Sequence, residues 1–242
     1  MGAVGNKVYF APNVTFANFI ATNNPYKIID FYNDRLIGYY FDAAEFLITN
    51  HKKEDAFAAG LICFAAIDAI ASITIGGRSG HRFKKWLNDN IDEFSILGVM
   101  LIDRVYREFR CGLVHEAKIH NAGQFTYNDI NRIVNVKGEG IIVINPEKLL
   151  GAIRKVFSTI IRDTKTDINV AKNFSKKVKK RFRSDFKVVK EMLCENCEGI
   201  GEDPNTDEVC KYCDGSGYDE EKLYANEIEN AEDAAYFSNV SG

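Results

Sequence analysis

The sequence lacks the features that mark secreted, membrane-spanning and nucleotide-cradling proteins. Residues 1–10 have no charged start followed by an apolar run, so no secretory signal is expected. The one stretch long enough to span a bilayer, AFAAGLICFAAIDAIASITI at 56–75, carries Asp68 and is rich in alanine, which favours a buried helix. The glycine-rich GGRSGHRFKKW has neither Walker nor dinucleotide spacing. We therefore expect a cytoplasmic protein that does not enter a membrane.

A large net charge is also absent, but the near-neutral total conceals two charged segments. The 242 residues carry 31 Lys and Arg against 34 Asp and Glu, a net charge of −3 at pH 7. Residues 171–193 hold nine Lys or Arg against two acidic residues, and residues 194–242 hold fourteen acidic residues against two Lys. This asymmetry predicts a basic segment that can meet a polyanion, and an acidic tail that can compete for the same segment.

The basic segment admits two interpretations. KNFSKKVKKRFRSDFK interleaves Phe174, Phe182 and Phe186 with cations, which suits single-stranded RNA because cations bind phosphates and rings stack on bases. The alternative is an amphipathic helix whose phenylalanines pack on the protein and whose lysines are solvated. The candidate RNA contacts in this segment are Lys176, Lys177, Lys179, Lys180, Arg181 and Arg183.

Apolar periodicity predicts a mainly helical protein. Apolar residues recur at helical spacing over 28–50, and the alanine-rich stretch 56–75 has the length of a buried helix. The short connection NHKKED makes these two helices an antiparallel pair. The glycines of GGRSGH then end the second helix.

The second half of this region predicts two more helices, a hairpin and a final helix. The helices are expected from about 81 to 90 and from 95 to about 118. Short β-rich runs joined around KGEG predict a β-hairpin. Asn145 is then a natural N-cap, with Pro146 at the first helical position of a helix that runs to about residue 162.

The elements divide the chain into five expected segments. A helical domain covers 27–165 and carries the hairpin as an insertion. The other segments are an N-terminal extension without predicted structure at 1–26, a basic helix or linker at 166–193, a zinc knuckle at 194–217 and the acidic tail at 218–242.

Four cysteines have the spacing of a zinc site. Cys194, Cys197, Cys210 and Cys213 form C-x2-C-x12-C-x2-C, and each two-residue gap lets both sulfurs of a knuckle face one point. In a chain without a secretory signal, disulfides are the weaker interpretation. Because all four ligands are thiolates, one structural Zn²⁺ is expected rather than a catalytic one. Its removal is predicted to unfold 194–217 and to leave the helical domain intact.

Each knuckle is followed by glycines at the same offsets, in CENCEGIG and CKYCDGSG. This C-x-x-C-x-G-x-G pattern resembles the cysteine-rich zinc domain of DnaJ-type co-chaperones. Two repeats occur here, enough for one zinc ion, where the domain of that family holds two. The chain has no His-Pro-Asp signature of a J domain, so the resemblance does not imply co-chaperone activity.

The stretch YREFRCGLVHEA places Arg110 and His115, one of four histidines, within about one and a half turns of helix. At roughly 100° per residue, Arg104 and Arg107 fall on the same polar arc and are further candidate RNA contacts. One interpretation is a solvated face, with arginines paired to nearby carboxylates and His115 at a helix C-terminus. The other is catalytic. Arginine binds phosphate oxygens and imidazole transfers protons, so together they can promote attack by a ribose 2′-hydroxyl.

The order of the helices, the Arg-x4-His spacing of RCGLVH and the IIVINPEKLL helix start resemble a HEPN domain over roughly residues 28–163. The resemblance implies an all-helical, usually dimeric fold. It also implies that Arg110 and His115 of two chains form a composite site that cleaves RNA without a metal. Toxin or defence roles are common in that family, which implies a neutralising antitoxin-type partner.

One position departs from the pattern of the active members. In many of them Asn, Asp or His follows the arginine, whereas Cys111 follows Arg110 here. A thiol hydrogen-bonds only weakly. The predicted function is therefore a ribonuclease acting on single-stranded or looped RNA. The alternative is a non-catalytic HEPN module that binds RNA, a nucleotide or a partner protein.

Overall fold

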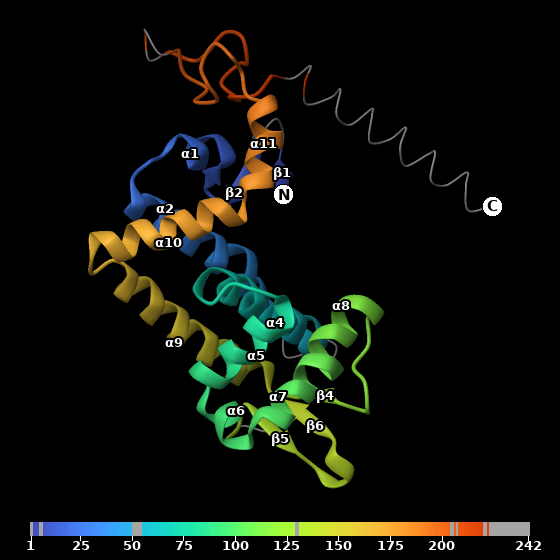
Figure 1. The fold of residues 1–242 in the computed structure, drawn as a ribbon. Helices are drawn as coiled ribbons and strands as arrows, with labels where there is room; N and C mark the ends of the chain where they lie inside the picture. Colours follow the sequence, from blue (N-terminus) through green and yellow to red (C-terminus); the bar gives the residue numbers. More distant parts are fainter. Residues whose placement is uncertain are drawn as a thin grey trace, which may run out of the picture. The chain divides into compact units, whose positions relative to one another are not determined.

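The computed structural model describes residues 2–4, 7–49, 55–128, 131–203, 206, 208–219 and 222. The described chain is mainly helical, as predicted, with small sheets and four clustered cysteines near its C-terminal end. It forms two compact units. Unit 1 comprises Met1–Phe31 together with Phe182–Gly242, and unit 2 comprises Tyr32–Arg181. Figure 1 labels helices and strands of both units.

Unit 2 is mainly helical and includes one small sheet. Its helices are α2 (Pro25–Leu36, which starts in unit 1), α3 (Asp42–Thr49), α4 (Asp55–Thr74), α5 (Ser79–Asn90), α6 (Asp92–Leu97), α7 (Val99–Val105), α8 (Gly112–Glu116), α9 (Pro146–Thr164) and α10 (Ile168–Arg181). The π-helical segments η1 (Ile37–Phe41) and η2 (Tyr106–Cys111) join α2 to α3 and α7 to α8. The helices predicted over 28–50 and 56–75 are confirmed.

Helix α4 is the central helix of unit 2. It packs against α3, α5, α9 and α10. Its length and apolar composition would suffice to cross a membrane, but ten of its residues are buried, among them Cys63, Phe64 and Ile67. Such burial is typical of the core helix of a soluble protein, because a helix that is apolar all round must be covered by protein or by lipid.

The helix predicted over 95–118 is divided, so its boundary is wrong. Ser95 belongs to α6, and Gly98, with a φ of 85°, separates α6 from α7. Glycine adopts that φ without steric cost, and it turns the chain between the two helices. Helix α7 then continues into the π-helical segment η2, where each backbone hydrogen bond joins residues five apart rather than four.

The hairpin and the capped helix are confirmed. β5 (Val134–Val136) and β6 (Ile142–Ile144) pair antiparallel on either side of KGEG, and β4 (Gln124–Phe125) adds a parallel strand to β6. Asn145 then caps α9, where its side chain accepts hydrogen bonds from the backbone N–H groups of Glu147 and Lys148. Pro146 occupies the first helical position.

Unit 1 joins the two ends of the chain. Its N-terminal part contains β1 (Gly2–Val4), β2 (Lys7–Ala11), β3 (Val14–Thr15) and α1 (Phe16–Ala21), and its C-terminal part contains α11 (Arg183–Glu191) and the cysteine module. The sheet has the antiparallel order β1-β2-β3. Ordered structure was not predicted for 1–26, because these strands are too short to show a period.

An aromatic cluster forms the core of unit 1. The ring of Phe10 stacks on Phe19 at 3.9 Å between centroids and meets Phe182 edge-on at 5.0 Å. Phe186 lies 5.2 Å from Phe19. Tyr218 is fully buried, and its hydroxyl donates to the carbonyl of Val8. Residues of both chain ends therefore share one core.

This core changes two of the expected segment boundaries. Tyr218 was assigned to the acidic tail at 218–242 but packs in unit 1, and residues 223–242 of that tail lie outside the described residues. The basic segment 166–193 is not one unit. It is divided at Phe182 between α10 of unit 2 and α11 of unit 1.

Candidate metal centre and Arg110–His115 site

Four buried cysteines meet at one point of unit 1. The sulfurs of Cys194, Cys197, Cys210 and Cys213 lie within 4.8 Å of one another, and each residue is at most 4% exposed. The Sγ atoms of Cys197 and Cys213 are 3.6 Å apart, and all four thiols are free. Tetrahedral thiolates at about 2.3 Å from Zn²⁺ would be roughly 3.8 Å apart. The donor set therefore fits a metal ion such as zinc.

A bound cation would also stabilise the ionised form of these four cysteines. Burial raises the pKa of Cys213 to about 12 and also raises the pKa of Cys197. The N–H groups of Gly201 and Gly217 each point at a sulfur, to Cys197 and Cys213, at 3.3 Å. Four thiolates this close repel one another, and only a bound cation can hold them all ionised.

The two knuckles clasp each other through their glycines. The N–H of Cys194 donates to the carbonyl of Gly217, and the N–H of Cys210 donates to the carbonyl of Gly201. A Cβ on Gly201 would lie 2.5 Å from the carbonyl oxygen of Gly215, and a Cβ on Gly217 would overlap the carbonyl oxygen of Gly199. The last glycine of each repeat is thus required by the backbone of the other repeat.

Arg110 is held by a carboxylate from the central helix. Its Nε and Nη2 donate to Oδ2 of Asp68, on α4, at 3.0 and 2.5 Å. The other oxygen of Asp68 accepts from the hydroxyl of Ser79 at 3.1 Å and lies 3.3 Å from Nη2 of Arg82, on α5. The side chains of Asp68, Arg82 and Arg110 are 14 to 17% exposed. Two guanidinium groups therefore share one carboxylate, so the three residues together carry a net positive charge.

The neighbouring groups strengthen the charged state of this cluster. Burial lowers the pKa of Arg110, but its hydrogen bonds to Asp68 and the charge of that carboxylate outweigh burial and raise it. The guanidinium carbon of Arg110 lies 5.8 Å from the ring centroid of Tyr106, and Nζ of Lys84 lies 5.7 Å from the same centroid. Burial raises the pKa of Tyr106, so its hydroxyl stays neutral. Two cations thus lie within 5.8 Å of the centre of the Tyr106 ring.

His115 is exposed on α8, just beyond η2. Within the part of the chain that the structure describes, its side chain makes no hydrogen bond or ion pair. Ala117, with a φ of 53°, ends α8 in a left-handed turn, and the chain folds back so that the N–H of His120 donates to the carbonyl of Glu108. The ring of His120 is 3.0 Å from the carboxylate of Glu116. The imidazole of His115 is therefore open to solvent without the loss of a described contact.

The predicted polar arc is not kept across η2. Arg104 donates to Glu108 and to the carbonyl of Gly140, whereas Arg107 donates to Asp103. Arg110 donates instead to Asp68 on α4. The assumption of 100° per residue fails because the π-helical turn is wider, so the three arginines reach three different partners.

The basic helices expose their cations and pack their rings. In α10, Lys176, Lys177, Lys180 and Arg181 are exposed and Lys179 is half-buried, which lowers its pKa. Arg183 is exposed on α11.

The rings of the same segment have protein neighbours. Phe174 packs on Tyr32 in unit 2, and Phe182 and Phe186 join the aromatic cluster of unit 1. The interpretation with packed phenylalanines and solvated lysines describes this segment better than base stacking does.

Sequence reasoning overlooked the partners of Arg110. Asp68 served only as an argument against a membrane span, and Ser79 and Tyr106 were not singled out. A lone carboxylate in a buried helix needs a charged partner, and that signal could have paired it with an arginine.

Comparison of the chain with protein-family models, with curated proteins and with solved structures finds no match. The assignment of its function therefore rests on the residues described above.

Proposed function

We propose that the chain is a metal-independent endoribonuclease of the HEPN type that acts on single-stranded or looped RNA. The observation that carries the proposal is the cluster in which Arg82 and Arg110 share the carboxylate of Asp68, together with the exposed imidazole of His115 five positions after Arg110 in the chain. Its surplus positive charge suits a phosphate, and Asp68 fixes the direction of the Arg110 guanidinium. A π-helical turn next to this cluster is also typical of functional sites.

The proposed chemistry needs only these groups. His115 removes the proton of a ribose 2′-hydroxyl, and the oxygen attacks the adjacent phosphorus. The bond from phosphorus to the 5′-oxygen breaks, and that oxygen takes up a proton as it leaves. The Arg110 guanidinium stabilises the added charge on the phosphate. Two proton transfers are required, so a second copy supplying its own His115 would complete the site, which agrees with the dimer implied by the HEPN resemblance.

A non-catalytic module is the second candidate, and two observations favour it. Two donors of Arg110 are already engaged by Asp68, which leaves fewer for a phosphate. Cys111 stands where active HEPN members often carry a stronger hydrogen-bonding group. In this case the cluster would bind RNA, a nucleotide or a partner protein without cutting.

The ends of the RNA products test the proposed reaction. We expect the purified protein to cleave a labelled, unstructured RNA in buffer without added divalent cations, and to leave 2′,3′-cyclic phosphate and 5′-hydroxyl ends. These ends follow from attack by the neighbouring 2′-hydroxyl. Mass spectrometry of the fragments identifies them. Products with 5′-phosphate ends would contradict the mechanism, and binding without cleavage would favour the module.

The proposal also covers further RNA contacts, the biological role and the location of the protein. The exposed cations Lys176, Lys177, Lys180, Arg181 and Arg183, with the half-buried Lys179, would extend the RNA contacts as separate phosphate ligands. A toxin or defence role, with a neutralising antitoxin-type partner, is implied by the HEPN resemblance alone. A cytoplasmic location agrees with the buried packing of α4 and with six free cysteines.

We further infer that the cysteine cluster holds one structural Zn²⁺. Cys194, Cys197, Cys210 and Cys213 fill all four positions of a tetrahedron, so the ion would have no open position for a substrate. Zinc bound there would stabilise unit 1, in which the cysteine module shares its core with the N-terminal strands.

Gly217→Ala is expected to lower the zinc affinity at least tenfold. The new Cβ would overlap the carbonyl oxygen of Gly199, and the residue would also be held at a φ of 78°. Gly215→Ala is the matched control. It has a similar φ of 75°, but its Cβ would meet the side chain of Val209 at 3.2 Å and would lie at an ordinary van der Waals distance of 3.8 Å from the carbonyl oxygen of Gly201. Competition with a chromophoric chelator measures both affinities. Equal losses would show that backbone strain, rather than the contact between knuckles, accounts for the pattern.

A further inference from the structure

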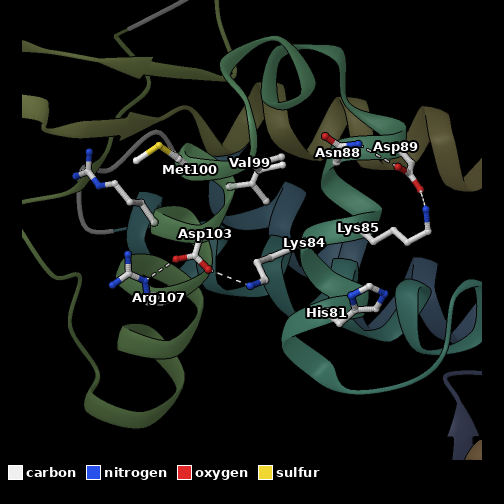
Figure 2. Close-up of a pocket in the computed structure, with 11 residues that line it drawn as sticks. His81, Lys84, Lys85, Asn88, Asp89, Val99, Met100, Asp103 and Arg107 are labelled. Carbon is white, nitrogen blue, oxygen red and sulfur yellow. Dashed lines mark hydrogen bonds and ion pairs between the residues drawn. The ribbon is translucent and has the colours of Figure 1, made fainter.

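A hollow of about 680 Å³ lies between α5 and α7 in unit 2. Its size is within the range of pockets that hold small ligands. Its lining combines apolar side chains, among them Val99 and Met100, with cations, among them Lys84 and Arg107. Figure 2 shows Asp103 between Lys84 and Arg107. Apolar surface and cations in one hollow are the two kinds of group that a nucleotide requires.

The charges of the hollow leave one cation without a full partner. Lysine and arginine contribute four of its lining residues, namely Lys84, Lys85, Arg104 and Arg107. Lys85 pairs with Asp89, and Arg104 pairs with the adjacent Glu108. Asp103 alone serves both Lys84, at 2.9 Å, and Arg107, at 2.8 Å. One carboxylate cannot neutralise both, so the hollow carries a surplus positive charge.

The ion pairs around Asp103 are also easy to exchange. The side chains of Lys84, Asp103 and Arg107 are 38, 41 and 67% exposed. Pairs between exposed groups contribute little to stability. A phosphate can therefore take Lys84 and Arg107 without leaving a buried charge unpaired.

The apolar part of the hollow is unusually accessible. Val99 and Met100 are 74 and 82% exposed, at the turn that Gly98 makes between α6 and α7. A thioether makes favourable contacts with aromatic rings. Met100 thus offers a surface on which a base can lie while the adjoining phosphate meets the cations.

The hollow connects to the Arg110 cluster through one side chain. Lys84 lines the hollow and lies over the ring of Tyr106, and Arg110 lies over the same ring. We propose that the hollow binds one nucleotide of single-stranded RNA, with its phosphate on Lys84 and Arg107 and its base on Met100, so that the next phosphate is led toward Arg110. This inference rests on the proposal that unit 2 acts on RNA.

The test measures binding separately from cleavage. The probe is a fluorescein-labelled, eight-nucleotide RNA with 2′-O-methyl groups, which cannot undergo attack by a 2′-hydroxyl. Lys84→Gln combined with Arg107→Gln should weaken binding at least tenfold at low salt. It should also reduce the slope of log K against log salt by about 0.7, the contribution of one neutralised phosphate in a single strand. Fluorescence anisotropy at several salt concentrations gives both values.

Two matched controls test whether the effects come from the hollow itself rather than from the loss of any two positive charges or of any exposed apolar side chain. Lys148→Gln combined with Arg162→Gln removes the same charges from exposed positions of α9, and it should leave the slope unchanged. Met100→Ala should weaken binding without altering the slope. Ile96→Ala should not weaken binding, because Ile96 is equally exposed, at 82%, but does not line this hollow.

The outcomes distinguish this inference from the proposed function. Equal binding by wild type and the Lys84/Arg107 variant, or no binding by wild type, overturns the nucleotide site. Cleavage of unmodified RNA by the same variant at the wild-type rate would overturn it while the nuclease stands. Binding through the hollow without any cleavage supports the site and rejects the nuclease. If Ile96→Ala and Met100→Ala both abolish self-association and neither alters RNA binding, the apolar turn is an interface with a second copy and the inference fails.

Discussion

Removal of the zinc ion proposed for the cysteine cluster is expected to unfold unit 1 and to leave unit 2 folded. The apparent stabilisation by structural zinc in small peptides is about 10 to 16 kcal/mol, which exceeds the stability of most small domains. The sequence alone predicts that only 194–217 would unfold. The shared core extends the effect, because Tyr218 donates to Val8, and Phe182 and Phe186 pack on Phe10 and Phe19.

Hydrogen exchange read by mass spectrometry locates this unfolding. After treatment with a strong chelator under reducing conditions, peptides from 7–21 and 183–219 should lose protection, whereas peptides from 56–74 and 146–164 should keep it. Cys197→Ser should reproduce the effect without chelator and lose the bound zinc. Cys111→Ser removes a thiol outside the cluster and should change neither result. Loss of protection confined to 194–217 would refute the shared core, and loss everywhere would refute separate units.

The parts of the fold that the sequence predicted are those with local signals. The buried helix α4 is recognisable from twenty nearly uninterrupted apolar residues, and α9 from Asn145 and Pro146 at its start. The spacing of the cysteines identifies their cluster because both members of each knuckle are close in sequence. Each of these signals lies within one element, so no distant partner is needed to interpret it.

The structure of unit 1 depended on contacts that no local pattern reveals. Phe10 meets Phe182, and Val8 meets Tyr218, across almost the whole length of the chain. The strands β1, β2 and β3 have two to five residues, too few for a period to be recognised. For these elements the tertiary contact, rather than the propensity of the segment, determines the structure.

The candidate site shows the same division. Arg110 and His115 were found from a short spacing, but the residue that positions Arg110 is Asp68, 42 positions earlier in the chain. A helical wheel with about 100° per residue also cannot predict the π-helical turn η2. Predicting it would have required knowing that Arg110 pairs with α4 while Phe109 remains in the core.

Replacing His115 with alanine is expected to slow RNA cleavage by a factor of about 10² to 10⁴, the usual contribution of a general acid or base. The free energy of unfolding should not change measurably, because the side chain is exposed and the described residues offer it no hydrogen bond or ion pair. RNA affinity should also be retained, since proton transfer contributes to the reaction rather than to binding. The effect should therefore appear in kcat and not in KM.

Two further variants make this result specific. His120→Ala removes an imidazole from the same region that pairs with Glu116, and it should retain most of the activity. Asp68→Asn leaves Arg82 and Arg110 without their shared charge, so it should reduce both stability and cleavage. Single-turnover cleavage and chemical denaturation measure the two effects on the same preparations. If His115→Ala cleaves as fast as wild type, the exposed imidazole has no part in the reaction, and the Arg110 cluster is then better explained as a binding site for RNA, a nucleotide or a partner protein.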